Sequence, residues 1–340
     1  MKQVLFPEVV WFQEGPGVRN TQYTNSGVKL LNVANLVDGK VDLSNTDRYI
    51  SEEEAYGKYK HFLVDDGDFI IASSGIKVEY FDKKMGFISE TQLPLCMNTS
   101  TIRFKVLDKS ILDIRYFMYF LKTDRFKQQL AREITGSAQL NFGPSHLKKM
   151  HLPLIDLTAQ RHIAAVLDKV SDLMAKRRQQ LDKLDELVKS RFIEMFGDIN
   201  VNDKGWTIQP LGELCTIVRG GSPRPIEKFL GGDVPWIKIG DATDDESIYL
   251  HSTKEHIIRE GVSKSRMVKA GSLIFANCGV SLGFARIITF DGCIHDGWLA
   301  MEDIDARLDK VFLLQALNQM TEHFRKIAPA GTQPNLNTAI

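Results

Sequence analysis

Residues 158–196 read TAQRHIAAVLDKVSDLMAKRRQQLDKLDELVKSRFIEMF and contain neither glycine nor proline. Apolar side chains recur through this stretch at heptad spacing, with a second apolar set between them. At 1.5 Å per residue, the pattern predicts a single helix roughly 55–60 Å long. We name its apolar face the helix stripe, which comprises Ile163, Leu167, Val170, Met174, Leu181, Leu184, Val188 and Met195.

The residues at both ends of this stretch favour helix boundaries. Pro153 ends the preceding segment, and either Asp156 or Thr158 can cap the free N–H groups of the first turn. Gly197 follows the last apolar residue. Two interpretations stay open: a long helix packed on its own domain, or a spacer on which partners dock. We favour the spacer, because the helix is longer than a flanking domain needs.

The same order of features stands on both sides of this helix. Each side has an apolar strand and then a second one, within FLVDDGDFIIASSG at residues 62–75 and RMVKAGSLIFANCG at residues 266–279. A glycine turn opens each second strand and a small polar loop closes it. A helical segment and a Gly/Gln/Asn segment follow on each side. We therefore predict an α+β protein in which a long heptad-bearing helix (156–197) separates two similar mixed α/β domains (1–155 and 198–340).

Composition indicates a soluble globular protein, with 43% hydrophobic and 25% charged residues in 340. No apolar run is long enough to cross a bilayer and no signal peptide is present, so we expect a cytoplasmic protein. The 43 basic residues balance 43 acidic ones, so any contact with nucleic acid must come from local patches or from a partner. The spacing of Cys96, Cys215, Cys278 and Cys293 predicts reduced thiols rather than disulfides or a zinc site.

Patterns of the common catalytic sites are missing from the sequence. It has no GxxxxGK[ST] phosphate loop, no GxSxG elbow and no HExxH helix. His295 before Asp296, and the acidic clusters at 52–54 and 65–68, could suggest a metal or nuclease site. We interpret the histidine as a surface or structural residue, and the clusters as a solvated helix start and a turn between strands. We therefore expect a non-catalytic chain with no metal or cofactor of its own.

Two similar modules spaced by a long helix suit a protein that reads two separated places on duplex DNA. Arg forks address guanine edges, Asn and Gln bond adenine, and Ser or Lys contact phosphates, although a solvated loop residue without a ligand is the alternative at each position. The candidates in the first half are Arg19, Asn20, Gln22, Tyr23, Ser73, Ser74 and Lys77, and those in the second are Arg219, Ser222, Arg224, Lys228, Asn277, Ser281 and Arg286. Because these loops differ between the halves while the strands agree, we expect the two halves to read different sequences.

A Gly-x-x-Gln-x-Asn turn leads into LPLxxLxxQ just before the long helix. The residues of this motif are Gly136, Gln139, Asn141, Leu152, Pro153, Leu154, Leu157 and Gln160. With the repeat and the heptads, it resembles the DNA specificity subunit of type I restriction–modification systems, over essentially the whole chain.

The resemblance implies a non-catalytic subunit with two target-recognition domains, each of which binds one half of a bipartite DNA target. It implies that the central helix docks methyltransferase subunits, which bring S-adenosylmethionine, and that a restriction subunit joins through them. Family members continue into a distal conserved helix that pairs antiparallel with the central one, and this sequence stops before it. We therefore expect the helix stripe to lack that partner and two chains to associate through it.

A different class of function remains as the alternative. A coiled-coil scaffold protein with two protein-binding domains would share the helix and the repeat, but it would not select a DNA sequence. A single-chain methyltransferase–nuclease would need a methyl-donor loop and an aromatic-flanked proline motif, and the sequence has neither.

Overall fold

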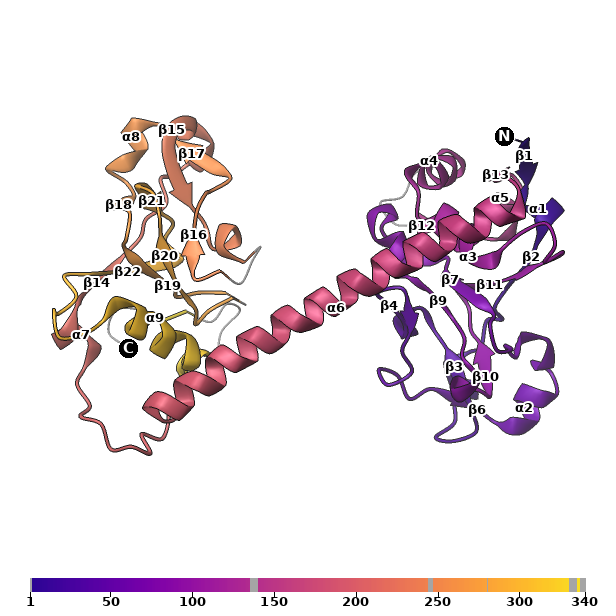
Figure 1. Ribbon diagram of the computed structural model, residues 1–340, viewed down its shortest axis with the longest axis horizontal. Coiled ribbons are helices and arrows are strands. Elements are labelled where there is room, and N and C mark those ends of the chain that lie inside the picture. Colours follow the sequence, from indigo (N-terminus) through magenta and orange to yellow (C-terminus); the bar gives the residue numbers. More distant parts are fainter. Residues whose placement is uncertain (1, 135–139, 244–246, 280, 330–334, 337–340) are drawn as a thin grey trace. The chain divides into compact units, whose positions relative to one another are not determined.

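The computed structural model describes residues 2–134, 140–243, 247–279, 281–329 and 335–336 (Figure 1). The chain divides into a first unit, Met1–Arg177, and a second unit, Arg178–Ile340, with the boundary inside one long helix. Gly136 and Gln139 of the sequence motif lie outside the described residues.

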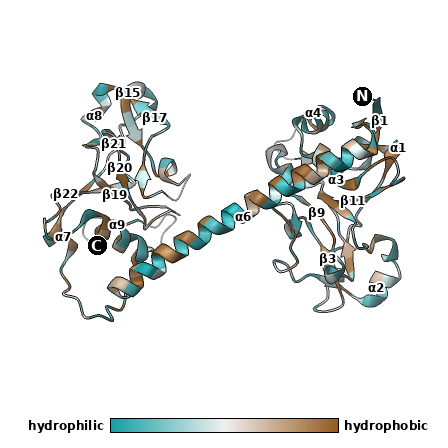
Figure 2. Ribbon diagram, viewed as in Figure 1, coloured by the Kyte–Doolittle hydropathy of each residue, from teal (hydrophilic) through white to brown (hydrophobic). Residues whose placement is uncertain are grey.

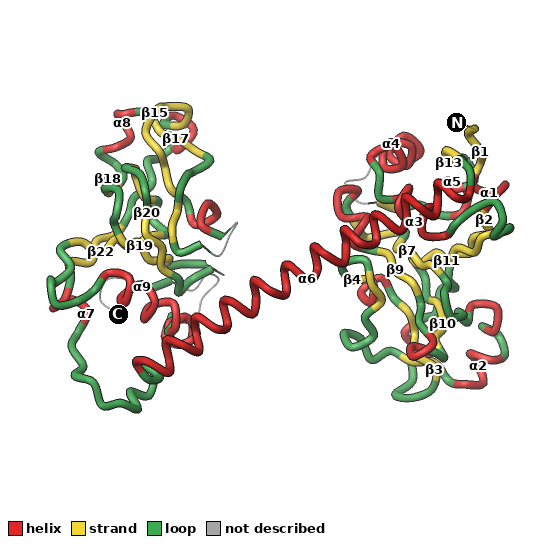
Figure 3. Tube along the Cα trace, viewed as in Figure 1, coloured by secondary structure: helices red, strands yellow, loops and turns green. Residues whose placement is uncertain are grey.

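The first unit is built on an antiparallel sheet of order β2-β11-β7-β9 and a smaller sheet of order β10-β3-β6, in which β3 and β10 are parallel. Helices α3 and α4 lie at one end of the unit with the β1–β13 pair, and α2 lies at the other end near β3 and β6 (Figures 1 and 3). The strands are β1 (Lys2–Leu5), β2 (Val10–Glu14), β3 (Val28–Leu31), β4 (Leu36–Val37), β5 (Lys40–Val41), β6 (Tyr49–Ile50), β7 (Phe69–Ala72), β8 (Ser74–Ile76), β9 (Met85–Phe87), β10 (Leu95–Met97), β11 (Thr101–Val106), β12 (Leu140–Asn141) and β13 (His151–Leu154). The helices are α1 (Phe6–Val9), α2 (Glu52–Tyr56), α3 (Ile114–Leu121), α4 (Asp124–Glu133) and α5 (Pro144–Leu147).

The second unit contains a sheet of order β14-β22-β19-β20-β16 and a second sheet of order β17-β15-β21-β18. Its strands are β14 (Thr216–Arg219), β15 (Leu230–Ile237), β16 (Tyr249–Leu250), β17 (Glu255–Ile257), β18 (Arg266–Val268), β19 (Leu273–Ala276), β20 (Ala285–Ile288), β21 (Gly292–Ile294) and β22 (Trp298–Glu302). Its helices are α7 (Leu211–Leu214), α8 (Arg259–Val262), α9 (Lys310–Gln319) and α10 (Thr321–Ile327).

The two units share one strand order, which confirms the predicted repeat. The order β2-β11-β7-β9 corresponds to β14-β22-β19-β20, and the parallel pair β3–β10 corresponds to β15–β21. Each second apolar strand, β7 or β19, follows a glycine with positive φ, Gly67 at 77° or Gly271 at 86°. A side chain would be strained at either position, which explains why the turn is a glycine in both halves.

The Asn-containing segment near the end of each half closes its unit in the same way. The Phe142 N–H donates to the carbonyl oxygen of Ser73 at 2.9 Å, and the Leu336 N–H donates to that of Asn277 at 2.8 Å. In the first unit this segment is β12, which pairs with β8. The motif therefore has a structural role, because it pairs with the loop that follows the second apolar strand.

Aromatic side chains fill the core of the first unit. The ring of Phe6 lies 5.0 Å from that of Phe117 on α3 and 5.9 Å from that of Phe126 on α4. The side chains of Asp113 and Thr123 cap the first turns of these two helices. In the second unit, Asp309 caps α9 in the same manner.

Helix α6 (Leu157–Phe196) confirms the long helix that the heptads predict. The Ala159 N–H donates to Asp156 Oδ1 at 2.9 Å, so Asp156 provides the predicted cap. Gln160 of the motif is fully buried: its Oε1 accepts the Asp113 N–H at 2.9 Å, and its Nε2 donates to the Ile111 and Ile155 carbonyl oxygens. This glutamine fixes the first turn of α6 to the loop that precedes α3.

An ion pair is buried in the first unit, at the position where the sequence predicts a turn between strands. Asp68 is 4% exposed, and its Oδ2 accepts from Arg103 Nη1 at 3.0 Å. The other Nη hydrogens of Arg103 go to Gln13 Oε1 and to the carbonyl oxygens of Leu63 and His61, while its buried Nε has no hydrogen-bond partner among the described residues. The predicted turn between strands is present at residues 65–68, and nothing in the sequence indicated that strand β11 places a buried cation beside Asp68.

The cysteines and the helices add two further facts. All four cysteines are free, and burial raises the pKa of the Cys96 thiol to about 12.

Within the described ranges, no helix combines the length and the apolar character needed to cross a membrane.

Candidate functional site

A pocket of about 480 Å³ opens in the second unit beside the loop that joins β14 to β15. We name it the reading pocket; it is lined by Ser222, Pro223, Arg224, Pro225, Ile226, Glu227, Trp236 and His295. The loop can lie this close to β21 because it begins with two glycines. A Cβ on Gly220 would stand 2.2 Å from the His295 carbonyl oxygen, so no other residue fits there without a shift of the backbone.

Asp296 organises the side chains at the edge of this pocket. Its Oδ1 accepts from the Ser222 hydroxyl at 2.9 Å, and its Oδ2 lies 3.8 Å from Arg224 Nη2. Its backbone carbonyl accepts from Arg219 Nε at 3.1 Å. Three of the sequence candidates are therefore brought together by one carboxylate residue, while both arginines remain exposed to solvent.

His295 forms a half-buried wall of the reading pocket against Trp236, with ring centroids 5.4 Å apart. The Gly297 N–H lies 2.9 Å from His295 Nδ1, and the same ring nitrogen lies 3.0 Å from Asp296 Oδ1. Burial lowers the pKa of His295, and the nearby Asp296 carboxylate offsets this only in part. Burial therefore favours the neutral form of the imidazole.

The lowered pKa of His295 predicts how the stability of the second unit depends on pH. Below the ordinary histidine pKa of 6.5, His295 binds a proton more readily in the unfolded chain than in the folded chain. The second unit is therefore more stable above this pH, and it loses stability as the pH falls below it. Chemical unfolding followed from about pH 7.5 to about pH 5 should show this loss, and His295→Gln should reduce it. His323→Gln, at an exposed histidine of α10, should leave the pH profile unchanged.

The corresponding loop of the first unit is organised differently. Arg19 and Asn20 are exposed, and neither makes a side-chain hydrogen bond within the part of the chain that the structure describes. Gln22 Nε2 donates to Glu54 Oε1 at 2.6 Å and to the Tyr59 hydroxyl at 3.1 Å. Gln22 therefore joins its loop to α2, while Arg19 and Asn20 keep free side chains.

Other sequence candidates divide into buried and accessible residues. Ser73 is 1% exposed and Asn277 is fully buried, with Asn277 Nδ2 donating to the Leu336 carbonyl oxygen at 2.8 Å. Direct DNA contact by these two residues is wrong as a prediction, because each is buried in the loop with which the Asn-containing segment of its unit pairs. Partly or fully exposed candidates, which stay predictions, are Tyr23, Ser74, Lys77, Lys228, Ser281 and Arg286.

Sequence reasoning missed Trp236, Glu227, His295 and Asp296 as members of the site. The His-Asp pair stood out in the sequence only as a weak metal motif, and no cluster of three potential metal ligands occurs among the described residues. The available signal was position: His295 and Asp296 directly follow β21, which is parallel to β15, so both strands end at the same edge.

The helix stripe forms a second surface of functional interest. Every one of its residues is exposed, from 37% for Leu167 to 68% for Met174. Figure 2 shows apolar residues recurring between hydrophilic ones along α6. The described chain thus leaves apolar side chains in solvent at regular spacing, which is typical of a surface that a partner covers.

The family model and the curated relatives that the chain matches describe the same kind of protein. Residues 19–183 match the model of the type I restriction modification DNA specificity domain. The chain is 23% identical over 190 residues to the type I restriction enzyme MjaVIII specificity subunit, and 22% identical over 219 residues to the MjaIX specificity subunit, both from Methanocaldococcus jannaschii. These alignments cover 55% and 60% of this chain and 43% and 50% of the relatives, so the chain spans about half their length.

Solved structures agree at the level of the fold. A crystal structure of the type I restriction–modification S subunit from M. genitalium matches 96% of this chain and 78% of its own, with a TM-score of 0.53 and 16% identity. A structure from a study of type I R-M complex assembly matches 99% of this chain and 82% of its own, with the same score and identity. Residues 19–183 are therefore similar to the type I restriction modification DNA specificity domain, and the chain as a whole has a fold like that of the S subunits to which it is compared.

Proposed function

We propose that this chain is a non-catalytic subunit that recognises DNA sequence, with each unit reading one half of a bipartite target. The observation that carries the proposal is the Asp296-centred arrangement at the reading pocket. It presents Arg219 and Arg224 beside a hydroxyl and a neutral imidazole, in the unit whose fold repeats that of the specificity domain. Guanidinium forks and neutral donors are the groups that read base edges in a groove.

Methylation and cleavage belong, on this proposal, to partner subunits. The helix stripe supports docking, because it offers apolar side chains to a helix of another subunit. A methyltransferase docked there would carry S-adenosylmethionine, and a restriction subunit would join through it. The balanced charge of the chain suits this arrangement, since a partner can supply part of the contact with phosphates.

Selection from a random duplex pool tests the proposal directly. The chain is mixed with the pool, alone and with its methyltransferase partner, and bound DNA is sequenced. We expect enrichment of two short conserved blocks separated by a spacer of fixed length. A complex that forms with the partner but enriches no sequence would favour the scaffold function instead.

Arg224→Ala is expected to relax selectivity in only one of the two blocks. Loss of one guanidinium fork should weaken binding to the selected duplex by about 1–3 kcal/mol, which is roughly 5–150-fold, measured by titration at fixed salt. Arg259→Ala is the matched control, because both arginines have 81% exposed side chains, but Arg259 pairs with Asp233 away from the pocket. Equal effects of the two substitutions would show that Arg224 acts only through its charge.

A further inference from the structure

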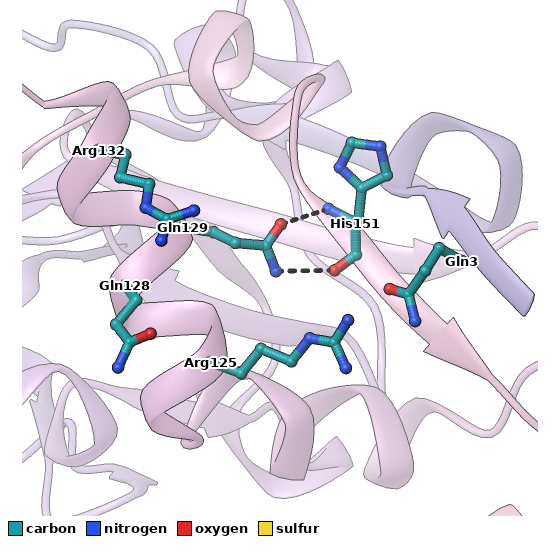
Figure 4. A pocket seen from close by; sticks show the side chains of 6 residues that line it. All are labelled: Gln3, Arg125, Gln128, Gln129, Arg132 and His151. Carbon is teal, nitrogen blue, oxygen red and sulfur yellow. Dashed lines mark hydrogen bonds between the residues drawn. The ribbon is translucent and has the colours of Figure 1, made fainter. Parts of the chain in front are cut away.

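A second pocket, of about 300 Å³, lies in the first unit between α4 and the β1–β13 pair (Figure 4). We name it the arginine pocket; it is lined by Gln3, Arg125, Gln128, Gln129, Arg132 and His151. Gln129 fixes its geometry, because its Nε2 donates to the His151 carbonyl oxygen at 3.0 Å and its Oε1 accepts the His151 N–H at 2.8 Å. Helix α4 and strand β13 are thereby held on either side of the pocket.

The charge in the arginine pocket is unbalanced. No carboxylate lines it, and the nearby Glu133 is bound by Lys149 at 2.6 Å. Within the described ranges, neither Arg125 nor Arg132 has a hydrogen-bond or ion-pair partner. Arg125 and Arg132 are separated by about 10 Å of rise along α4, and both side chains are exposed with unused donors, which is an arrangement suited to anions.

The side chains that line the arginine pocket indicate which class of anion it binds. Interfaces between proteins have a core of apolar residues and of Tyr, Trp or Phe, whereas this pocket is lined by Arg, Gln and His side chains. Contacts to the DNA backbone are made instead by arginines, amides and other uncharged donors, which is the set present here. The observations therefore favour phosphodiester groups over an acidic protein segment.

The pocket lies away from the loops that carry the candidate base readers of the first unit. Gln22 bonds Glu54 of α2, which places the Arg19 loop at the α2 end, whereas α4 and the β1–β13 pair lie at the opposite end (Figure 1). We propose that the arginine pocket binds the phosphate backbone of DNA beside the recognised sequence, with Arg125 and Arg132 each addressing a phosphate. This inference rests on the proposed DNA recognition and extends it to a contact that carries no sequence information.

The salt dependence of DNA binding tests the inference. Affinity for the selected duplex and for a random-sequence duplex of the same length is measured at several salt concentrations. For Arg125→Gln/Arg132→Gln, we expect the slope of log affinity against log salt to fall by about two, since each phosphate contact contributes roughly 0.9. Affinity should drop by the same factor on both duplexes, so the preference between them should not change.

Two further variants make the outcome decisive. Arg161→Gln/Lys169→Gln removes the same charge from exposed positions on α6 and should leave the slope within about half a unit of the wild type. Arg125→Lys/Arg132→Lys keeps the charge and should retain most of the slope. An unchanged slope in the glutamine variant, with sequence selection intact, would overturn the arginine pocket alone. Loss of binding to a methyltransferase partner with an unchanged slope would assign the pocket to protein and also overturn the inference.

Failure of the proposed function would look different. A wild-type chain that shows no sequence preference would refute DNA reading. The arginine pocket would then be judged on the random duplex at low salt, where an equal slope in wild type and glutamine variant would refute it as well.

Discussion

Replacing Arg103 by methionine is expected to lower the free energy of unfolding of the first unit by about 3–5 kcal/mol. Arg103 is 5% exposed and Asp68 is 4% exposed, so the substitution would leave a buried carboxylate without its main partner. Lys105, which lies 3.3 Å from Asp68 Oδ1, is partly exposed and compensates for little of this loss. Chemical denaturation with a probe in the first unit measures the change.

Two comparisons isolate the buried ion pair. Arg115→Met breaks the exposed pair with Asp168 and should cost only about 0–1 kcal/mol. Adding Asp68→Leu to Arg103→Met should recover part of the stability, because no uncompensated charge remains buried. A loss below about 1 kcal/mol for Arg103→Met alone would mean that water or a neighbouring group solvates Asp68.

Leu181→Lys with Leu184→Lys on α6 is expected to abolish association through the helix stripe. Both leucines are about half exposed in the described chain, so the substitutions should leave each unit folded. If a partner covers them, two lost leucine contacts weaken binding by roughly 3–6 kcal/mol, which is at least a hundredfold. Analytical ultracentrifugation of the chain alone measures whether two copies associate. A pull-down assay measures whether a methyltransferase partner binds.

The matched control adds the same charge on the opposite side of α6. Ala175→Lys with Gln179→Lys lies outside the heptad positions, and both residues are exposed. We expect this variant to associate like the wild type. Suppose that the wild-type chain is a monomer, and that the leucine variant captures the methyltransferase partner as well as the wild type does. The helix stripe would then have no role in association.

Local patterns in the sequence were sufficient to predict the long helix and the repeat of the two units. Helix α6, the cap at Asp156 and the repeated order of strands depend on side-chain periodicity and turn residues within short windows. The expectation that the helix stripe is exposed came instead from the family resemblance.

The reading pocket could not be predicted in the same way, because it is formed by contacts between residues that lie far apart in the sequence. Asp296 meets Ser222 across 74 residues, and this meeting requires the parallel pairing of β15 with β21. Ser73 and Asn277 looked like accessible loop residues, but the closing segments, which come much later in the chain, bury them. Burial of a polar side chain in a loop is thus decided by long-range pairing, which composition and motifs do not reveal.

The middle of α6 is exposed to solvent in the part of the chain that the structure describes. Residues 171–184 are exposed on every side, while Gln160, Ala164 and Phe192 near its two ends are buried. Its backbone hydrogen bonds therefore depend on local propensity alone, and such segments exchange their amide protons by local opening. The affinity of any protein that covers α6 must accordingly include the free energy of suppressing those openings, so a substitution that changes only helix propensity can alter assembly without touching a contact.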